Sequence, residues 1–280
     1  MKLFRRGSHA ETKPEEISST VTPAMEKKAA MEYHLANLQG IGTREAQEDA
    51  FAFGNALDPE AIEKGGLLAV VADGMGGMAD GRTASATVTE TLLQDFAHFD
   101  AKADLAGQLE SAVHHAGDAV WRKLREQGGS TVVAGLIFQE KLYFTSVGDS
   151  SLYLLRDTRL IHLNRSQNVL NNERLRAIRE GHLDPQAGQL EPDRDAITQF
   201  VGLAELEETD SLRRPLALLP GDVLLFCTDG VAGVLDETIL RNCLLDAQPE
   251  AMCRSIEEKI RTAGRKYQDN YTALIIQCRK

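Results

Sequence analysis

Acidic residues stand at five places where an apolar stretch of this chain meets a turn. They are Glu48, Asp49, Asp73, Asp149, Asp229 and Asp269. A carboxylate at the end of a buried strand loses contact with water, and several such groups together repel one another. Mg²⁺ and Mn²⁺ relieve that repulsion because they prefer carboxylate, carbonyl and water oxygens as ligands. The pattern therefore indicates a divalent metal site.

Glycines beside these acids extend the set of candidate ligands. Gly74 and Gly230 directly follow two of them, and a glycine lets the backbone bend so that a carbonyl, such as that of Gly74, joins the coordination. A single Asp-Gly after a strand is more often an ordinary turn. Five such places, with no His or Cys spacing typical of zinc, favour a metal cluster over five separate turns.

The elements that must position these residues follow from apolar periodicity. Apolar runs predict strands over residues 33–44, 51–54, 66–73, 130–138, 141–147, 151–156, 196–202, 222–228 and 271–277. Repeats of three and four residues predict helices from about 81 to 99 and over 105–124, 237–245 and 250–262. Strands without helical crossovers, and helices in adjacent pairs, predict an α+β fold of antiparallel sheets flanked by helices.

Two segments fall outside this pattern. Residues 1–32 have no apolar periodicity and are predicted to be a disordered tail, which leaves residues 33–280 as the folded domain. Residues 163–195 form a polar insertion that is too long for an ordinary connection, and such insertions are commonly functional.

Composition excludes several classes of protein. The 280 residues carry a formal net charge of −11, which argues against nucleic-acid binding. No uncharged stretch approaches the ~20 apolar residues that span a bilayer. The four cysteines have no CxxC spacing and are typical of reduced thiols in a cytoplasmic protein.

Six strings resemble, in order, those of the type 2C metal-dependent Ser/Thr protein phosphatases, and the bacterial members are closest in style. They are GTREAQEDAFAFG, VVADGMGGMADGRTASA, GGSTVVAGLI, FTSVGDS, LLPGDVLLFCTDGV and QDNYTALII. The resemblance covers residues 38–277. It implies a sandwich of two antiparallel β-sheets with helices on both outer faces and a flap at about residues 163–195.

The resemblance also implies the composition of the site. Two Mn²⁺ or Mg²⁺ ions are expected at one end of the sandwich, with ligands that correspond to Asp73, the Gly74 carbonyl, Asp229 and Asp269. Glu48 and Asp49 are both candidates for the acid of the first motif. Asp149 corresponds to a ligand of a third, weaker metal, and Asn270 is expected just behind the ligands.

Arginines complete the expected site. Arg44 matches the arginine that binds the substrate phosphate, and its planar fork suits that task. Four arginines of the flap are candidates for substrate contact: Arg165, Arg174, Arg176 and Arg179. Arg174, Arg176 and Arg179 are more often simply the solvated face of a helix.

The implied activity is hydrolysis of phosphoserine and phosphothreonine in proteins by direct attack of a metal-bridging hydroxide. No Cys-x5-Arg loop or DxDxT string is present, which argues against a phosphoenzyme. The expected partners are a phosphorylated protein substrate and an opposing Ser/Thr kinase. The expected state is a cytoplasmic monomer that neither binds nucleic acid nor spans a membrane.

Departures from the family pattern leave rival hypotheses open. Gly233 stands where the family has an acid, LNRS replaces the flap string LT-x-D-H-S, and Met75 stands where eukaryotic members have histidine. A catalytically weak pseudophosphatase acting as a regulatory binding module is one alternative. A regulator phosphatase of the anti-anti-sigma type is another. The presence of every core acid favours an active enzyme.

Overall fold

The computed structural model describes residues 31–280 except 77, 126 and 185. The predicted tail therefore lies outside the described residues, apart from its last two positions. Glu32, which the sequence pattern assigned to the tail, is the first residue of strand β1 (Glu32–Gly40). Residues 31–280 form one compact unit.

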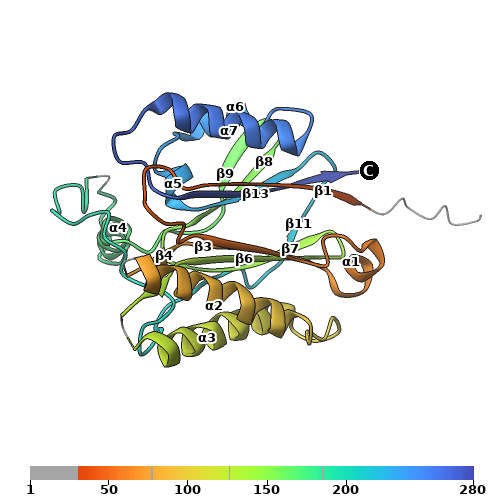
Figure 1. Cartoon of the computed structure of the whole chain (residues 1–280), viewed down its shortest axis with the longest axis horizontal. Coiled ribbons are helices and arrows are strands. Elements are labelled where there is room, and N and C mark those ends of the chain that lie inside the picture. Colours follow the sequence, from red (N-terminus) through yellow and green to blue (C-terminus); the bar gives the residue numbers. More distant parts are fainter. Residues whose placement is uncertain (1–30, 77, 126, 185) are drawn as a thin grey trace, which may run out of the picture. The chain divides into compact units, whose positions relative to one another are not determined.

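Two antiparallel β-sheets form the centre of this unit (Figure 1). The first has the strand order β1, β13 (Tyr271–Arg279), β12 (Val223–Cys227), β8 (Ser151–Arg156) and β9 (Arg159–His162). The second has the order β10 (Asp210–Ser211), β7 (Lys141–Val147), β6 (Val132–Phe138), β3 (Leu67–Ala72) and β2 (Ala50–Gly54), and β11 (Leu216–Ala217) also pairs with β7. The short strands β4 (Gly74–Met75) and β5 (Gly129–Ser130) pair with each other.

Helices cover the outer face of each sheet (Figure 1). Helices α2 (Met78–Phe96) and α3 (Leu105–Leu124) cover the sheet of β3, whereas α6 (Glu237–Cys243) and α7 (Pro249–Ala263) cover the sheet of β12. The predicted two-sheet sandwich with helices on both outer faces is thus confirmed. Two more helices, α1 (Pro59–Gly65) and the single turn α5 (Asp229–Ala232), follow β2 and β12.

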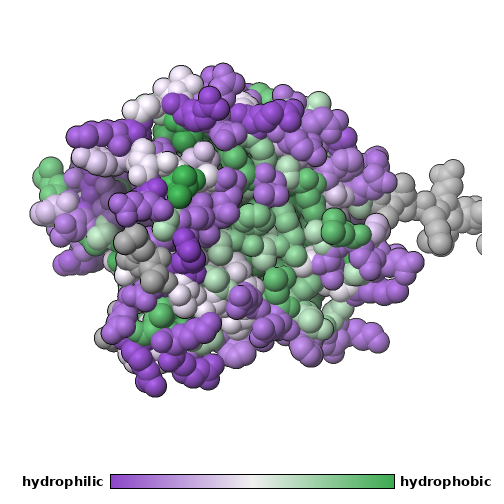
Figure 2. All heavy atoms as spheres, in the orientation of Figure 1, coloured by the Kyte–Doolittle hydropathy of each residue, from purple (hydrophilic) through white to green (hydrophobic). Residues whose placement is uncertain are grey.

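Successive side chains of a strand point to opposite faces of its sheet, so the two sheets form three apolar layers. One layer lies between the sheets, and one lies under the helices on each outer face. In β3, Leu68 and Val70 pack against α2 and α3, while Leu67 and Val71 face the first sheet, that of β12 and β13. Every residue of β3 is buried, as expected for a strand with apolar layers on both faces. Figure 2 shows hydrophobic side chains gathered where the two sheets meet and hydrophilic side chains over the outer helices.

The predicted strand over residues 196–202 was wrong. This segment makes only two isolated bridges, between Ile197 and Asn168 and between Val201 and Ser130. Its apolar residues serve different neighbours, because Ile197 lines a pocket and Val201 packs in the α2–α3 layer. Within the predicted flap, the regular element is helix α4 (Val169–Arg179).

The structure also bears on the cysteines and on membrane-spanning helices. The four cysteines are buried and free, two in β12 and β13 and two in α6 and α7. No helix in the described part of the chain is long and apolar enough to cross a membrane.

Candidate active site

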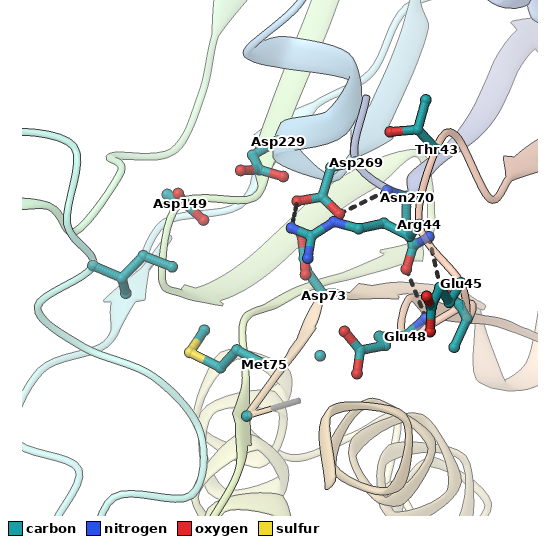
Figure 3. A pocket seen from close by; sticks show the side chains of 14 residues that line it. Thr43, Arg44, Glu45, Glu48, Asp73, Met75, Asp149, Asp229, Asp269 and Asn270 are labelled. Carbon is teal, nitrogen blue, oxygen red and sulfur yellow. Dashed lines mark hydrogen bonds and ion pairs between the residues drawn. The ribbon is translucent and has the colours of Figure 1, made fainter. Parts of the chain in front are cut away.

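A pocket of about 530 Å³ lies at the end of the sandwich where strand ends and connecting loops meet. Five of the six acidic residues singled out in the sequence line it: Glu48, Asp73, Asp149, Asp229 and Asp269. Arg44, Gly74 and Asn270 line it as well. Figure 3 shows these carboxylates directed towards a common space, with the Arg44 guanidinium among them.

The topology explains why residues so far apart in sequence meet here. Asp73 directly follows β3, Asp229 lies two residues after β12, and Asp269 lies two residues before β13. Asp149 lies in the turn that joins β7 to β8, which belong to different sheets. Because the strands are antiparallel, these starts and ends fall at the same edge of the sandwich.

Asp49 is buried behind the pocket instead of lining it. Its Oδ2 accepts hydrogen bonds from the hydroxyls of Thr228 (3.0 Å) and Thr272 (2.7 Å). Its Oδ1 has no hydrogen-bond partner. Burial raises the pKa of Asp49 to about 7, against the lowering effect of the two threonine hydroxyls. The two candidates for the first acid thus differ in position, with Glu48 in the pocket and Asp49 beneath it.

Asn270 organises the loop that carries these acids. Its Oδ1 accepts a hydrogen bond from the Glu48 backbone N–H (2.7 Å). Its Nδ2 donates to the carbonyls of Ile41 (2.9 Å) and Ala46 (3.0 Å). One amide therefore fixes the loop of residues 41–48 relative to the start of β13.

Asp73 and Asp229 form a closely coupled pair. Burial raises the pKa of Asp73 far above its usual value, and the charges of Asp49 and Asp229 raise it further. Burial also raises the pKa of Asp229. Burial and the charge of Asp229 raise the pKa of Asp149 to about 7. The pocket thus crowds negative charge where water is scarce.

Arg44 supplies positive charge at the centre of this group. Its Nη2 forms an ion pair with Asp269 Oδ2 at 2.5 Å, and this hydrogen bond is the main cause of the raised pKa of Arg44. Both side chains remain about half exposed, 55% for Arg44 and 40% for Asp269, so the guanidinium is accessible from solvent.

The donor set fits a hard divalent cation. Every candidate ligand is an oxygen, and Glu48, Asp49 and Asp229 each keep a buried carboxylate oxygen without a hydrogen-bond partner. A Cβ at Gly74 would lie 2.1 Å from the Gly81 carbonyl oxygen, so only glycine fits at this position. Within the described residues, no three His, Cys, Asp or Glu side chains enclose a single point at ligand distance.

The four flap arginines do not line the pocket. Arg176 pairs with Glu173 (3.5 Å) in α4 and with Glu180 (3.2 Å), the C-cap of that helix, which agrees with a solvated helix face. Arg165 precedes α4 and pairs with Glu208 (3.3 Å). Substrate contact by Arg165, Arg174, Arg176 and Arg179 remains a prediction.

Some residues around the pocket escaped the sequence reasoning. Thr228 and Thr272, which hold Asp49, stand in the strings CTDG and DNYT. Thr228 directly follows β12 and Thr272 lies in β13, so a polar β-branched residue beside an apolar run is the available signal. Thr43, Glu45 and Ile197 also line the pocket, and no local pattern marks them.

The family model for protein phosphatase 2C matches residues 43–270, and the chain belongs to this family. The match includes every acid described above and Arg44.

Individual relatives agree with that assignment. The chain is 31% identical over 229 residues to the serine/threonine protein phosphatase PstP of Mycobacterium tuberculosis, which covers 79% of this chain and 42% of PstP. The chain thus spans less than half the length of this relative. The PPM Ser-Thr phosphatase MsPP of Mycobacterium smegmatis, solved with cacodylate, has 28% identity and a TM-score of 0.69 over 87% of this chain and 97% of MsPP. The PstP catalytic domain, solved with two manganese ions, shares the fold at 22% identity and a TM-score of 0.71, over 90% of this chain and 100% of that domain.

Proposed function

We propose that this chain is a metal-dependent phosphoprotein phosphatase that hydrolyses phosphoserine and phosphothreonine. The supporting observation is the pocket lined by six carboxylates and one accessible arginine, with buried carboxylate oxygens left unpartnered. Membership in the protein phosphatase 2C family supports the same reaction. The substrates are proteins phosphorylated by a Ser/Thr kinase. The cytoplasmic location and the monomeric state remain predictions.

The residues divide the work by their positions. Asp73, Asp229, Asp269, Glu48 and the Gly74 carbonyl would hold two divalent cations, Mn²⁺ or Mg²⁺, with Asp149 towards a third. When bound, such ions neutralise charge on the phosphoryl group and lower the pKa of a water molecule to near neutrality. Arg44 lies within the same pocket and orients the substrate phosphate through paired N–H donors.

The observations favour an enzyme over a pseudophosphatase. A binding module has no need for several carboxylates with raised pKa values, because such groups cost folding free energy. Carboxylates with strongly shifted pKa values, and the folding free energy that they cost, are concentrated at functional sites. Gly233, which stands in place of an acid, leaves the pocket-lining carboxylates themselves in place.

Hydrolysis of p-nitrophenyl phosphate and of phosphothreonine peptides should require Mn²⁺ or Mg²⁺. EDTA-treated protein is expected to lose turnover, and added Mn²⁺ is expected to restore it, because the carboxylates otherwise repel an anionic substrate. Absorbance of released p-nitrophenol measures the rate. Turnover that persists after exhaustive chelation would rule out the metal-dependent reaction.

Arg44→Ala should raise KM for a phosphopeptide about tenfold and lower kcat by less, if the guanidinium binds phosphate equally in the ground and transition states. Arg214→Ala removes the same charge from an exposed position outside the pocket and is the matched control. Steady-state kinetics with both variants measure how the effect divides between KM and kcat. A kcat loss at constant KM would instead assign Arg44 to the transition state alone.

A further inference from the structure

The turn that carries Asp149 has a demanding conformation. Gly148 has φ of +96°, and a Cβ there would lie 2.7 Å from Thr131 Cγ2, so only glycine fits. A turn in this conformation needs contacts from outside it to keep its shape.

Gln167, which lies just before helix α4 of the flap, holds this turn through hydrogen bonds. Its Oε1 accepts a hydrogen bond from the Gly148 N–H, and its backbone N–H donates to the Gly148 carbonyl, both at 2.8 Å. Gln167 is only 1% exposed. Both polar groups of Gly148 are therefore held by one buried residue that precedes helix α4.

The same residue also holds the segment by which the flap returns. The Gln167 carbonyl accepts hydrogen bonds from the Thr198 N–H (2.9 Å) and the Thr198 hydroxyl (3.1 Å). Its Nε2 donates to the Glu208 carbonyl at 3.1 Å. Ile197, the neighbour of Thr198, lines the pocket. Gln167 thus joins the Asp149 turn, the start of the flap and its return.

Asn164 holds the other end of the turn. Its Nδ2 donates to the Ser150 carbonyl at 2.9 Å, and its Oδ1 accepts from the Leu152 N–H at 2.7 Å. Asn164 is 6% exposed. Two buried amides, three residues apart, therefore enclose Asp149 from both sides.

We propose that Gln167 is a positioning residue for the reaction: it holds Asp149 in place, with support from Asn164, and couples that placement to the flap. This inference rests on the proposed phosphatase function. A movement that separates residues 196–198 from Gln167 also loosens the contacts that fix Gly148. Flap position and the geometry of Asp149 therefore change together.

Gln167→Met tests this role because it keeps the length and apolar volume of the side chain and removes the amide. Gln108→Met is the matched control, since the side chain of Gln108 also holds a backbone from both sides, accepting from the Asp100 N–H (2.8 Å) and donating to the Asp100 carbonyl (3.0 Å). Gln108 does not line the catalytic pocket. Both variants are compared with the wild type by kinetics, Mn²⁺ calorimetry and hydrogen exchange of the EDTA-treated protein.

Gln167→Met is expected to lower kcat for p-nitrophenyl phosphate about tenfold or more at unchanged KM, with tight Mn²⁺ binding retained. Amide exchange should accelerate about tenfold at Gly148, whose N–H loses its acceptor, and should also accelerate at residues 149–150 and 197–198, because the backbone contacts through Gln167 loosen with it. Gln108→Met should accelerate exchange only around Asp100 and keep the wild-type kcat.

A wild-type kcat in Gln167→Met would overturn the proposal, and so would acceleration spread evenly over the chain, which indicates a general stability role. If the wild-type protein itself hydrolyses no phosphoester, the proposed function fails separately. Hydrogen exchange then still tests whether Gln167 holds the Asp149 turn. Local acceleration at residues 148–150 and 197–198 supports this role, and no acceleration there refutes it.

Discussion

Asp229→Asn and Asp73→Asn should each reduce turnover of p-nitrophenyl phosphate about a thousandfold or more at saturating Mn²⁺. Both carboxyls line the pocket, and burial raises the pKa of each. An amide has the same shape but lacks the charge, and its nitrogen cannot act as a ligand for a hard cation. Calorimetric titration should show weaker Mn²⁺ binding in both variants.

Folding and charge must be controlled in this comparison. Asp157→Asn removes one aspartate from a remote turn where φ is +48°, a conformation that asparagine tolerates, and it should leave turnover unchanged. Without metal, Asp73→Asn and Asp229→Asn should be at least as heat-stable as the wild type, because each removes repulsion. Full activity in either variant would place the catalytic site elsewhere.

The sequence predicts the fold correctly where a strand is buried on both faces or where the apolar repeat of a helix extends over several turns. The run LLAVVA allows only a strand with apolar neighbours on both faces, and β3 is that strand. Residues 196–202 (AITQFVG) are apolar at only four of seven positions and became an irregular segment. Its hydrogen bonds go to Ser130 and Gln167, which a local pattern cannot reveal.

The individual residues of the candidate site could be predicted from the sequence, but their arrangement in space could not. Each carboxylate at a strand end has a local signal, and the antiparallel topology then brings the strand ends together. The choice between Glu48 and Asp49 has no local signal. Asp49 lies beneath the pocket because Thr228 and Thr272, 179 and 223 positions away in sequence, bond to it. Contacts of this range depend on the tertiary structure alone.

Asp149→Asn should make the metal-free protein more stable at about pH 8 while it reduces turnover. Burial and Asp229 raise the pKa of Asp149 from 3.8 to about 7 in the folded protein. Folding therefore takes up a proton between these values, so this group's contribution is fully favourable below about pH 4 and is lost as the pH rises through about 7. An asparagine has no such loss.

The gain in unfolding free energy should be about 2 kcal/mol larger at about pH 8 than at about pH 5, a value reduced from the full shift to allow for local relaxation. Urea unfolding in EDTA, followed through Trp121 fluorescence, measures it at both pH values. Mn²⁺ should favour the wild type instead, because the cation then neutralises the carboxylate that destabilised it. Equal stability of Asp149→Asn and the wild type at about pH 8 would mean that Asp149 is solvated, as an ordinary turn aspartate is, and is not part of a crowded metal site.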